Sequence, residues 1–159
     1  RKLYELLGYT PERNYESITA FRSKMKEHRR KLVTRIAQQC RSVGAIAVEH
    51  AGSNLVRINN HLTADAVVVP FLHWSSRQIS WGWCFEVFFR PEVDVMVAAR
   101  LDRENENIES YYIIPQLAGF CGQFWVGDGA ELTFLEAYRS RSLVPLLETV
   151  FMYDSAEIA

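Results

Sequence analysis

The clearest pattern of hydrophobic and polar positions lies near the start of the chain, between residues 17 and 43. Its apolar residues are spaced by threes, fours and sevens: Ile18, Phe21, Met25, Leu32, Ile36 and Val43. This spacing puts them on one face of a helix and predicts a long amphipathic helix over residues 17–43. The other face is expected to carry the charged residues Arg22, Lys26, Arg29, Arg30 and Arg41. Gly44 is a natural stop for this helix.

After Gly44 the pattern changes to short apolar segments separated by turn residues. Six strands are predicted, over residues 45–50, 54–59, 62–72, 83–89, 93–101 and 111–114. The third and fifth of these are nearly continuous apolar runs, which are typical of strands covered on both faces. Pro70 cannot donate to a β-ladder, so it predicts an edge or a bulge near the end of the third strand.

The fourth predicted strand alternates, with Trp83, Phe85 and Val87 pointing one way and Glu86 the other. Residues 74–82 are predicted to form a loop, 102–109 an acidic turn, and the glycine-rich stretch around 119–129 an irregular segment. Two helices are predicted over residues 131–138 and 143–151.

These elements predict one α/β or α+β domain over residues 1–159, with a mixed sheet of about six strands. Residues 1–16 lead into the long helix (17–43), residues 44–115 form the sheet, and residues 116–159 are irregular with helices. Because the central strands are apolar on both sides, the N-terminal and C-terminal helices are expected to cover the two faces of the sheet. The chain begins at Arg1, so we expect it to be a piece of a longer protein.

Composition narrows the class of protein. The chain has 159 residues, of which 48% are hydrophobic and 23% charged, as in an ordinary globular domain. No apolar run approaches the ~20 residues of a membrane-spanning helix, so no membrane partner is expected. The three cysteines, Cys40, Cys84 and Cys121, are odd in number and widely spaced, which favours a reducing cytoplasm. Nucleotide-binding, hydrolase and zinc motifs are absent from the sequence.

The net charge of −1 hides an uneven distribution of basic and acidic residues along the chain. Residues 1–43 hold 11 Lys/Arg and 4 Asp/Glu, whereas residues 44–159 hold 7 and 15. Six cations fall within twelve residues of the long helix: Lys24, Lys26, Arg29, Arg30, Lys31 and Arg35. They are candidates for binding a phosphate backbone. The alternatives are a solvated face balanced by the acidic remainder, or docking to a second copy or to the parent protein.

Residues 17–115 resemble the PD-(D/E)XK restriction-endonuclease-like superfamily in the order of their elements. Residues 83–115 carry most of the resemblance: W-C-F-E-V-F-F, a short proline turn, D-V-M-V-A-A-R-L-D, a polar turn, and Y-Y-I-I-P. The resemblance implies a nuclease-like fold in a protein that handles DNA. In active members, two carboxylates hold Mg²⁺ and a lysine helps to position the attacking water.

The sequence departs from the pattern that this chemistry needs. All four lysines precede the first predicted strand, and Asp65 is followed by Val67 where the lysine would stand. We therefore expect a non-catalytic, nuclease-like domain of a cytoplasmic bacterial protein, with no cofactor. The first alternative is a diverged Mg²⁺-dependent nuclease that uses Asp65, Glu86 and Asp94. The second is a protein-interaction domain with no nucleic-acid role.

Aromatic residues flank the predicted loop 74–82. Trp74, Trp81 and Trp83 lie around Arg77, and aromatics combined with arginine can stack the bases of a single strand. The alternation of the fourth strand already explains Trp83 as a core residue. Trp74 and Trp81 are the candidates for a cross-strand pair that closes the hairpin.

Overall fold

The computed structural model describes residues 15–50, 52–73, 81–116, 121–127 and 133–157. Its first described element is α2 (Tyr15–Ser42), which agrees with the predicted helix within two residues at each end. All five buried residues of α2 lie in its second half: Leu32, Val33, Ile36, Ala37 and Cys40. Ile18 and Val43 were predicted for the buried face, but each is 37% exposed. Ile18 precedes the part of α2 that packs on the sheet, and Val43 lies beyond its last turn.

The helix ends as the sequence predicts. Gly44 adopts a φ of +90°, a conformation that favours glycine. The N–H of Gly44 donates to the carbonyl of Arg41 (3.0 Å) and that of Ala45 to the carbonyl of Cys40 (3.0 Å). These bonds satisfy carbonyls that the end of the helix would otherwise leave unpaired.

Six strands form the main sheet. In spatial order they are β1 (Ala47–Glu49), β2 (Leu55–Ile58), β3 (Leu62–Val69), β6 (Val95–Leu101), β7 (Ile108–Pro115) and β9 (Arg139–Ser140). All neighbours are antiparallel except β3 and β6, which are parallel. The chain is therefore an α+β domain with a mixed sheet, as predicted.

Pro70 divides the predicted third strand between two sheets. β3 ends at Val69, and the chain continues as β4 (Phe71–His73) in a second sheet with the order β4-β5-β8. Proline has no N–H to donate, so the ladder of the main sheet stops there. The second sheet is completed by β5 (Trp81–Val87) and β8 (Gly122–Gly127). The segment of β8 was predicted to be irregular, and this prediction is wrong because pairing with β5 satisfies its backbone.

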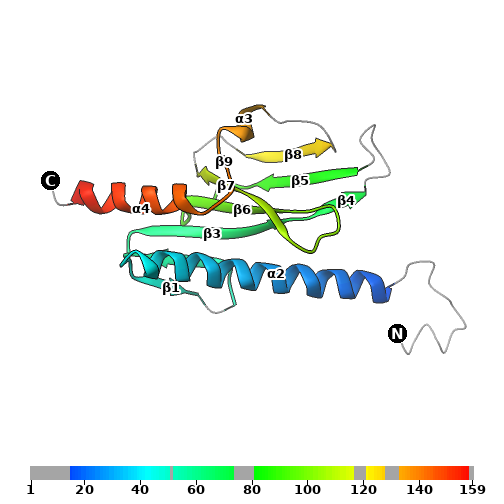
Figure 1. The fold of residues 1–159 in the computed structure, drawn as a ribbon, viewed down its shortest axis with the longest axis horizontal. Coiled ribbons are helices and arrows are strands. Elements are labelled where there is room, and N and C mark those ends of the chain that lie inside the picture. The colour runs from blue at the N-terminus through cyan, green and yellow to red at the C-terminus, as the bar shows by residue number, and fades with distance from the viewer. Residues whose placement is uncertain (1–14, 51, 74–80, 117–120, 128–132, 158–159) are drawn as a thin grey trace, which may run out of the picture.

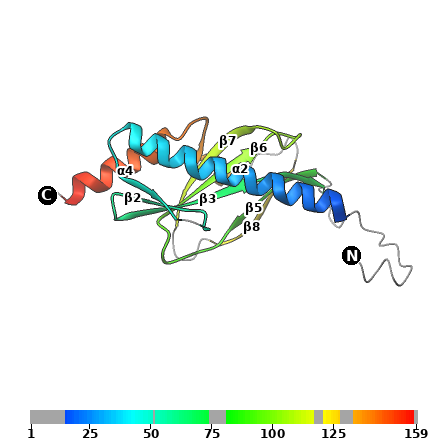
Figure 2. The ribbon, with the colours of Figure 1, turned by 90° about the horizontal axis from the view of Figure 1, so that it is seen from below.

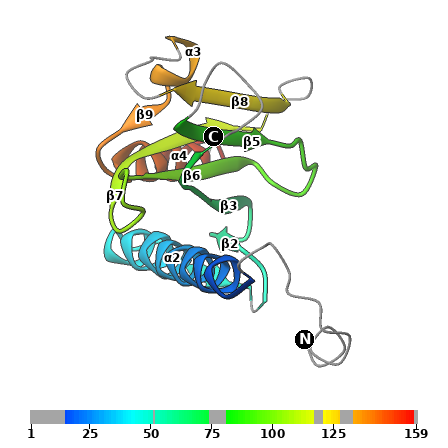
Figure 3. The ribbon, with the colours of Figure 1, turned by 90° about the vertical axis from the view of Figure 1, so that its right-hand side faces the viewer.

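Two cores lie on opposite faces of the main sheet. On one face, α2 and α4 (Val144–Glu157) pack on residues such as Ala66 and Val97. On the other face, the second sheet packs on residues such as Met96 and Tyr112. Figures 1 and 3 show the three layers, with α2 and the second sheet on opposite sides of the main sheet. Helices were expected on both faces. One face is instead covered by strands, because the chain leaves the main sheet at Pro70.

The C-terminal helices differ in length from the prediction. Of the predicted helix 131–138, the structure describes residues 133–138, where α3 (Thr133–Glu136) is a single turn that is followed by β9. The last helix is longer than predicted, since α4 runs to Glu157. At its start, the N–H of Val144 donates to Ser142 Oγ (3.4 Å). The Ser142 side chain therefore satisfies one of the N–H groups that the start of the helix leaves unpaired.

Candidate nucleic-acid interface

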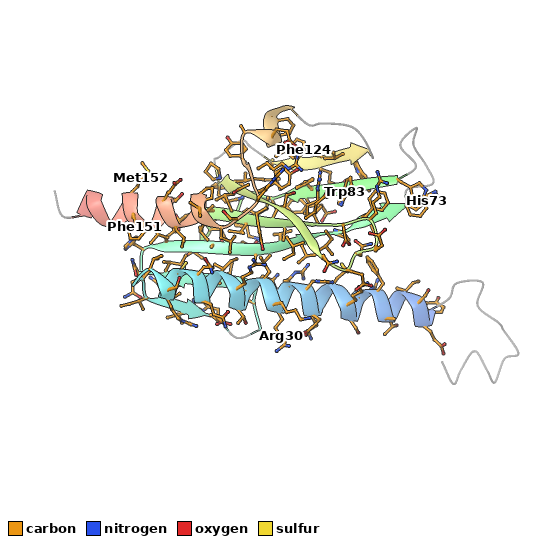
Figure 4. All side chains as sticks on the ribbon, in the orientation of Figure 1. Arg30, His73, Trp83, Phe124, Phe151 and Met152 are labelled. Carbon is orange, nitrogen blue, oxygen red and sulfur yellow. The ribbon has the colours of Figure 1, made fainter. Side chains whose placement is uncertain are left out.

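The six predicted nucleic-acid contacts lie on α2 but point to different sides of it. Residues four apart share one side of a helix, and Arg22, Lys26 and Arg30 form such a row. All three are exposed, and Figure 4 shows Arg30 pointing away from the main sheet. We call these three residues the basic row. Successive members are separated by about 6 Å along the helix axis.

Arg29 was predicted on the charged face, but it lies on the side of α2 that faces the sheet. It follows Met25 by four positions and precedes Leu32 by three, and both of these pack in the first core. Its Nε is buried and donates to no hydrogen-bond acceptor among the described residues. Arg29 is therefore not part of the exposed row.

Lys24 and Arg35 lie on a further side of α2, against the hairpin of β6 and β7. Lys24 forms an ion pair with Glu106 in the turn of that hairpin. The guanidinium of Arg35 lies 5.6 Å from the centre of the Tyr111 ring, in a cation–π contact. Two of the six predicted cations, Lys24 and Arg35, therefore pack the β6–β7 hairpin against α2.

Glu27 is an acid within the basic segment. Arg30 donates to it from Nε (3.0 Å) and Nη2 (2.8 Å), and Lys31 Nζ lies 3.8 Å from the same carboxylate. The hydrogen bond from Arg30 lowers the pKa of Glu27. Because this pair is exposed to solvent it is weak, and a phosphate can replace the carboxylate as partner of Arg30.

The acidic turn between β6 and β7 is closed by its own backbone. Asp102 accepts hydrogen bonds from the N–H groups of Glu106 (2.7 Å) and Asn107 (3.0 Å). Partial burial opposes ionisation of Asp102, but these hydrogen bonds hold its pKa below the usual value. This turn sits on the side of α2 that carries Lys24, so its negative charge is directed away from the basic row.

Asp65 is buried on β3, on the face that the second sheet covers. Its Oδ2 accepts a hydrogen bond from Arg90 Nη1 (3.1 Å). Its Oδ1 is buried with no hydrogen-bond partner in the described part of the chain. Burial raises the pKa of Asp65, and the nearby charges of Arg90 and Arg29 offset this only in part.

The other two candidate metal ligands have different surroundings. Asp94 is exposed, and its Oδ2 accepts from the N–H of Thr63 (2.7 Å), which fastens the start of β3 to β6. Glu86 points outward from the second sheet and accepts from Gln123 Nε2 (2.9 Å). Among the residues that the structure describes, no three His, Cys, Asp or Glu side chains are grouped as a metal site.

Aromatic side chains of β4 and β5 pack against one another in a row on one side of these two strands. Trp83 is buried, its Nε1 donates to the carbonyl of Leu101 (2.7 Å), and the guanidinium of Arg100 lies 4.5 Å from its ring centre. Trp81 is 50% exposed, and its cross-strand partner is His73. The predicted pair of Trp74 with Trp81, and the loop arginine Arg77, involve positions outside the described residues.

Comparisons with protein-family models, with curated proteins and with solved structures gave no significant match. The resemblance to the PD-(D/E)XK superfamily therefore rests on the sequence segments quoted above. Among the described residues, no helix has the length and apolar character needed to cross a bilayer.

Proposed function

We propose that this domain binds nucleic acid by its phosphate backbone, through the basic row Arg22, Lys26 and Arg30. The observation that carries the proposal is the row itself: three exposed cations, one helical turn apart, on the side of α2 away from the acidic turn. The whole helix carries eight Lys/Arg and two Glu. This excess provides the long-range attraction that brings a polyanion to the row.

The spacing of the row fits a phosphate backbone. Phosphates of one DNA strand follow each other at about 3.4 Å along the duplex axis. Cations about 6 Å apart along a helix can therefore meet roughly every second phosphate. Contacts of this kind carry no base readout, so the binding we propose is sequence-independent and strongly dependent on salt.

We further propose that the domain is not catalytic. A Mg²⁺ site shared by Asp65, Glu86 and Asp94 would need all three carboxylates at one opening. Arg90 already neutralises Asp65, and Asp94 accepts from a backbone N–H. These partners favour structural roles for both, and no observation favours the nuclease alternative.

The proposed setting is the cytoplasm of a bacterium, in a protein that handles DNA. The odd number and wide spacing of the three cysteines support a reducing compartment. Cys40 is buried, and its burial raises the pKa of the thiol to about 11. It therefore remains protonated and acts as an apolar core residue.

Fluorescence anisotropy with a labelled DNA duplex tests the proposal. Contacts to three phosphates predict a slope of log affinity against log salt of about −2.7, which is a roughly forty-fold loss between about 50 and 200 mM salt. The double variant Arg22→Glu/Lys26→Glu is expected to lose at least about ten-fold in affinity and to show a shallower slope.

The matched control is Arg57→Glu/Arg103→Glu, which changes the net charge equally at exposed positions off α2. Its affinity is expected to stay closer to that of the unchanged chain. Absence of binding at low salt, or equal losses in both variants, would refute the basic row as the binding surface. Cleavage of the DNA with Mg²⁺, lost in Asp65→Ala, would instead support the nuclease alternative.

A further inference from the structure

Two helical surfaces remain exposed at opposite ends of the molecule. α4 packs Leu146 and Val150 in the first core, but its last turns extend past the ends of the strands (Figure 1). α2 has no buried residue before Leu32. Figure 2 shows the first turns of α2 at one end of the molecule and the last turns of α4 at the other end.

The exposed side of α4 is apolar. Val144 is 51%, Phe151 50% and Met152 74% exposed, and Figure 4 shows Met152 on the projecting part of the helix. Val144 and Phe151 are seven positions apart and lie on the same side of α4, and Met152 adjoins Phe151 on the neighbouring side. Large apolar side chains that are exposed close together mark an interaction surface. The main sheet covers only one side of α4.

The charges of the two helices indicate which surface binds the exposed side of α4. The sequence of α4 contains three acids, Glu148, Asp154 and Glu157, and no lysine or arginine. The first half of α2, residues 15–31, contains six Lys/Arg and two Glu. It also begins with exposed apolar side chains, since Tyr15 is 57% and Ile18 37% exposed. An apolar and acidic helix at one end therefore matches an apolar and basic helix at the other.

We propose that two copies of this chain form a symmetric dimer, in which α4 of each copy lies against the first half of α2 of the other. Both helices lie on the same face of the main sheet and run in the same direction (Figure 1). A two-fold axis across them therefore brings both contacts together and pairs α4 antiparallel to the other copy's α2. The C-terminal end of α4, where the helix dipole is negative, then meets the positive N-terminal end of α2. The dimer contact includes the basic row on α2, but its α4 side carries no residue of that row, so a change in α4 tests the dimer without altering the proposed DNA contacts.

Sedimentation velocity over a range of protein concentrations tests the dimer. The unchanged chain is expected to form a reversible dimer whose dissociation constant rises with salt. Met152→Lys is expected to raise that constant by at least about ten-fold. Phe88→Lys is the matched control, because Phe88 is 56% exposed in the turn after β5, on neither helix, and the control is expected to dimerise normally.

Charge exchange tests the pairing of the two helices. Glu148→Lys alone and Arg22→Glu/Lys26→Glu alone are each expected to weaken the dimer, and an equal mixture of the two is expected to restore a mixed dimer. A monomer at every concentration would overturn the proposal. So would an Arg22→Glu/Lys26→Glu variant that dimerises normally, because that result means that the dimer does not use this part of α2. At protein concentrations where both are monomeric, Met152→Lys is expected to bind DNA as tightly as the unchanged chain does. The dimer proposal can therefore fail while the DNA-binding proposal stands, and the reverse.

Discussion

Arg41, in the last turn of α2, donates from Nε (3.1 Å) and Nη2 (2.6 Å) to the main-chain carbonyl of Ala47. Ala47 belongs to β1, the first strand of the main sheet, whose outer edge has no neighbouring strand among the described residues. The third nitrogen, Nη1, lies 3.5 Å from Glu49 Oε1 on the same strand. A side chain of the helix thus occupies backbone positions where another chain could pair.

Removing this cover is expected to promote aggregation. Arg41→Ala exposes the carbonyl of Ala47 at the edge of β1, and we expect faster aggregation on mild heating, followed by light scattering. Arg57→Ala is the matched control, since Arg57 donates in the same way to the carbonyl of Asn60 (3.2 and 2.9 Å), but at a turn. Equal aggregation of the two variants would show that Arg41 does not protect the edge.

Asn105 joins three layers of the fold through one side chain and one carbonyl. Its Oδ1 accepts from the N–H of Phe71 (2.7 Å) and its Nδ2 donates to the carbonyl of Phe71 (2.9 Å). Its own carbonyl lies 3.1 Å from His28 Nε2 on α2. Asn105→Asp replaces the donor with a carboxylate oxygen facing the carbonyl of Phe71. We expect it to lower the free energy of unfolding by about 1–3 kcal/mol in urea titrations.

Asn60→Asp provides the comparison for that variant. Both asparagines have positive φ, +57° at Asn105 and +63° at Asn60, and aspartate tolerates this region about as well as asparagine does. Asn60 is exposed, so its substitution is expected to change the stability by less than about 0.5 kcal/mol. A similar loss in both variants would place the effect in the turn conformation and not in the contact with Phe71.

Local patterns predicted the elements whose burial is periodic. The long helix followed from its apolar spacing, and the two central strands from continuous apolar runs that are covered on both faces. The second sheet could not be predicted, because its pairing joins β5 to β8 across 37 positions, as in the pair Glu86 and Gln123. Gly82, predicted to be in a loop, lies in β5, where a Cβ would overlap the carbonyl of Val126. Such a close approach leaves no local signal.

The candidate site was predictable as a segment but not residue by residue. The run of cations located α2, yet the helix turns Arg29 toward the sheet and Lys24 toward Glu106. Which side of a charged helix stays free depends on which strands and turns pack beside it. The position of the acidic turn is set by the pairing of β6 with β7 and by Asn105, and the sequence pattern specifies neither.

The burial of Asp65 predicts a dependence of stability on pH. Burial raises the pKa of Asp65 in the folded chain above its ordinary value of 3.8, so the folded state binds this proton more tightly than the unfolded state does. Stability due to Asp65 is therefore full below the ordinary value and falls as pH rises through the folded value. In Asp65→Asn, we expect the free energy of unfolding, measured in urea, to fall less between these two pH values than it does in the unchanged chain. An unchanged pH profile would contradict the prediction.

Arg90→Ala removes the cation that offsets the burial of Asp65. We expect a loss of about 1–2 kcal/mol at neutral pH, where the carboxylate is charged, and a smaller loss near pH 4. The moderate size reflects Arg90, whose side chain is 48% exposed. In the double variant with Asp65→Asn, removal of Arg90 is expected to cost less than it does alone. Additive losses would show that the two side chains do not interact.

DNA binding and dimerisation use the same part of α2, so the two are expected to compete. The basic row lies in the half of α2 that is proposed to receive α4 of the second copy, and a phosphate backbone would displace the acids of that helix. Adding a short duplex to the dimer is therefore expected to yield monomers with DNA bound, measured by sedimentation with absorbance of the labelled DNA. At protein concentrations that favour the dimer, Met152→Lys is expected to bind the duplex more tightly than the unchanged chain, because its α2 is free. A complex of one duplex with an intact dimer would show that the two surfaces do not overlap.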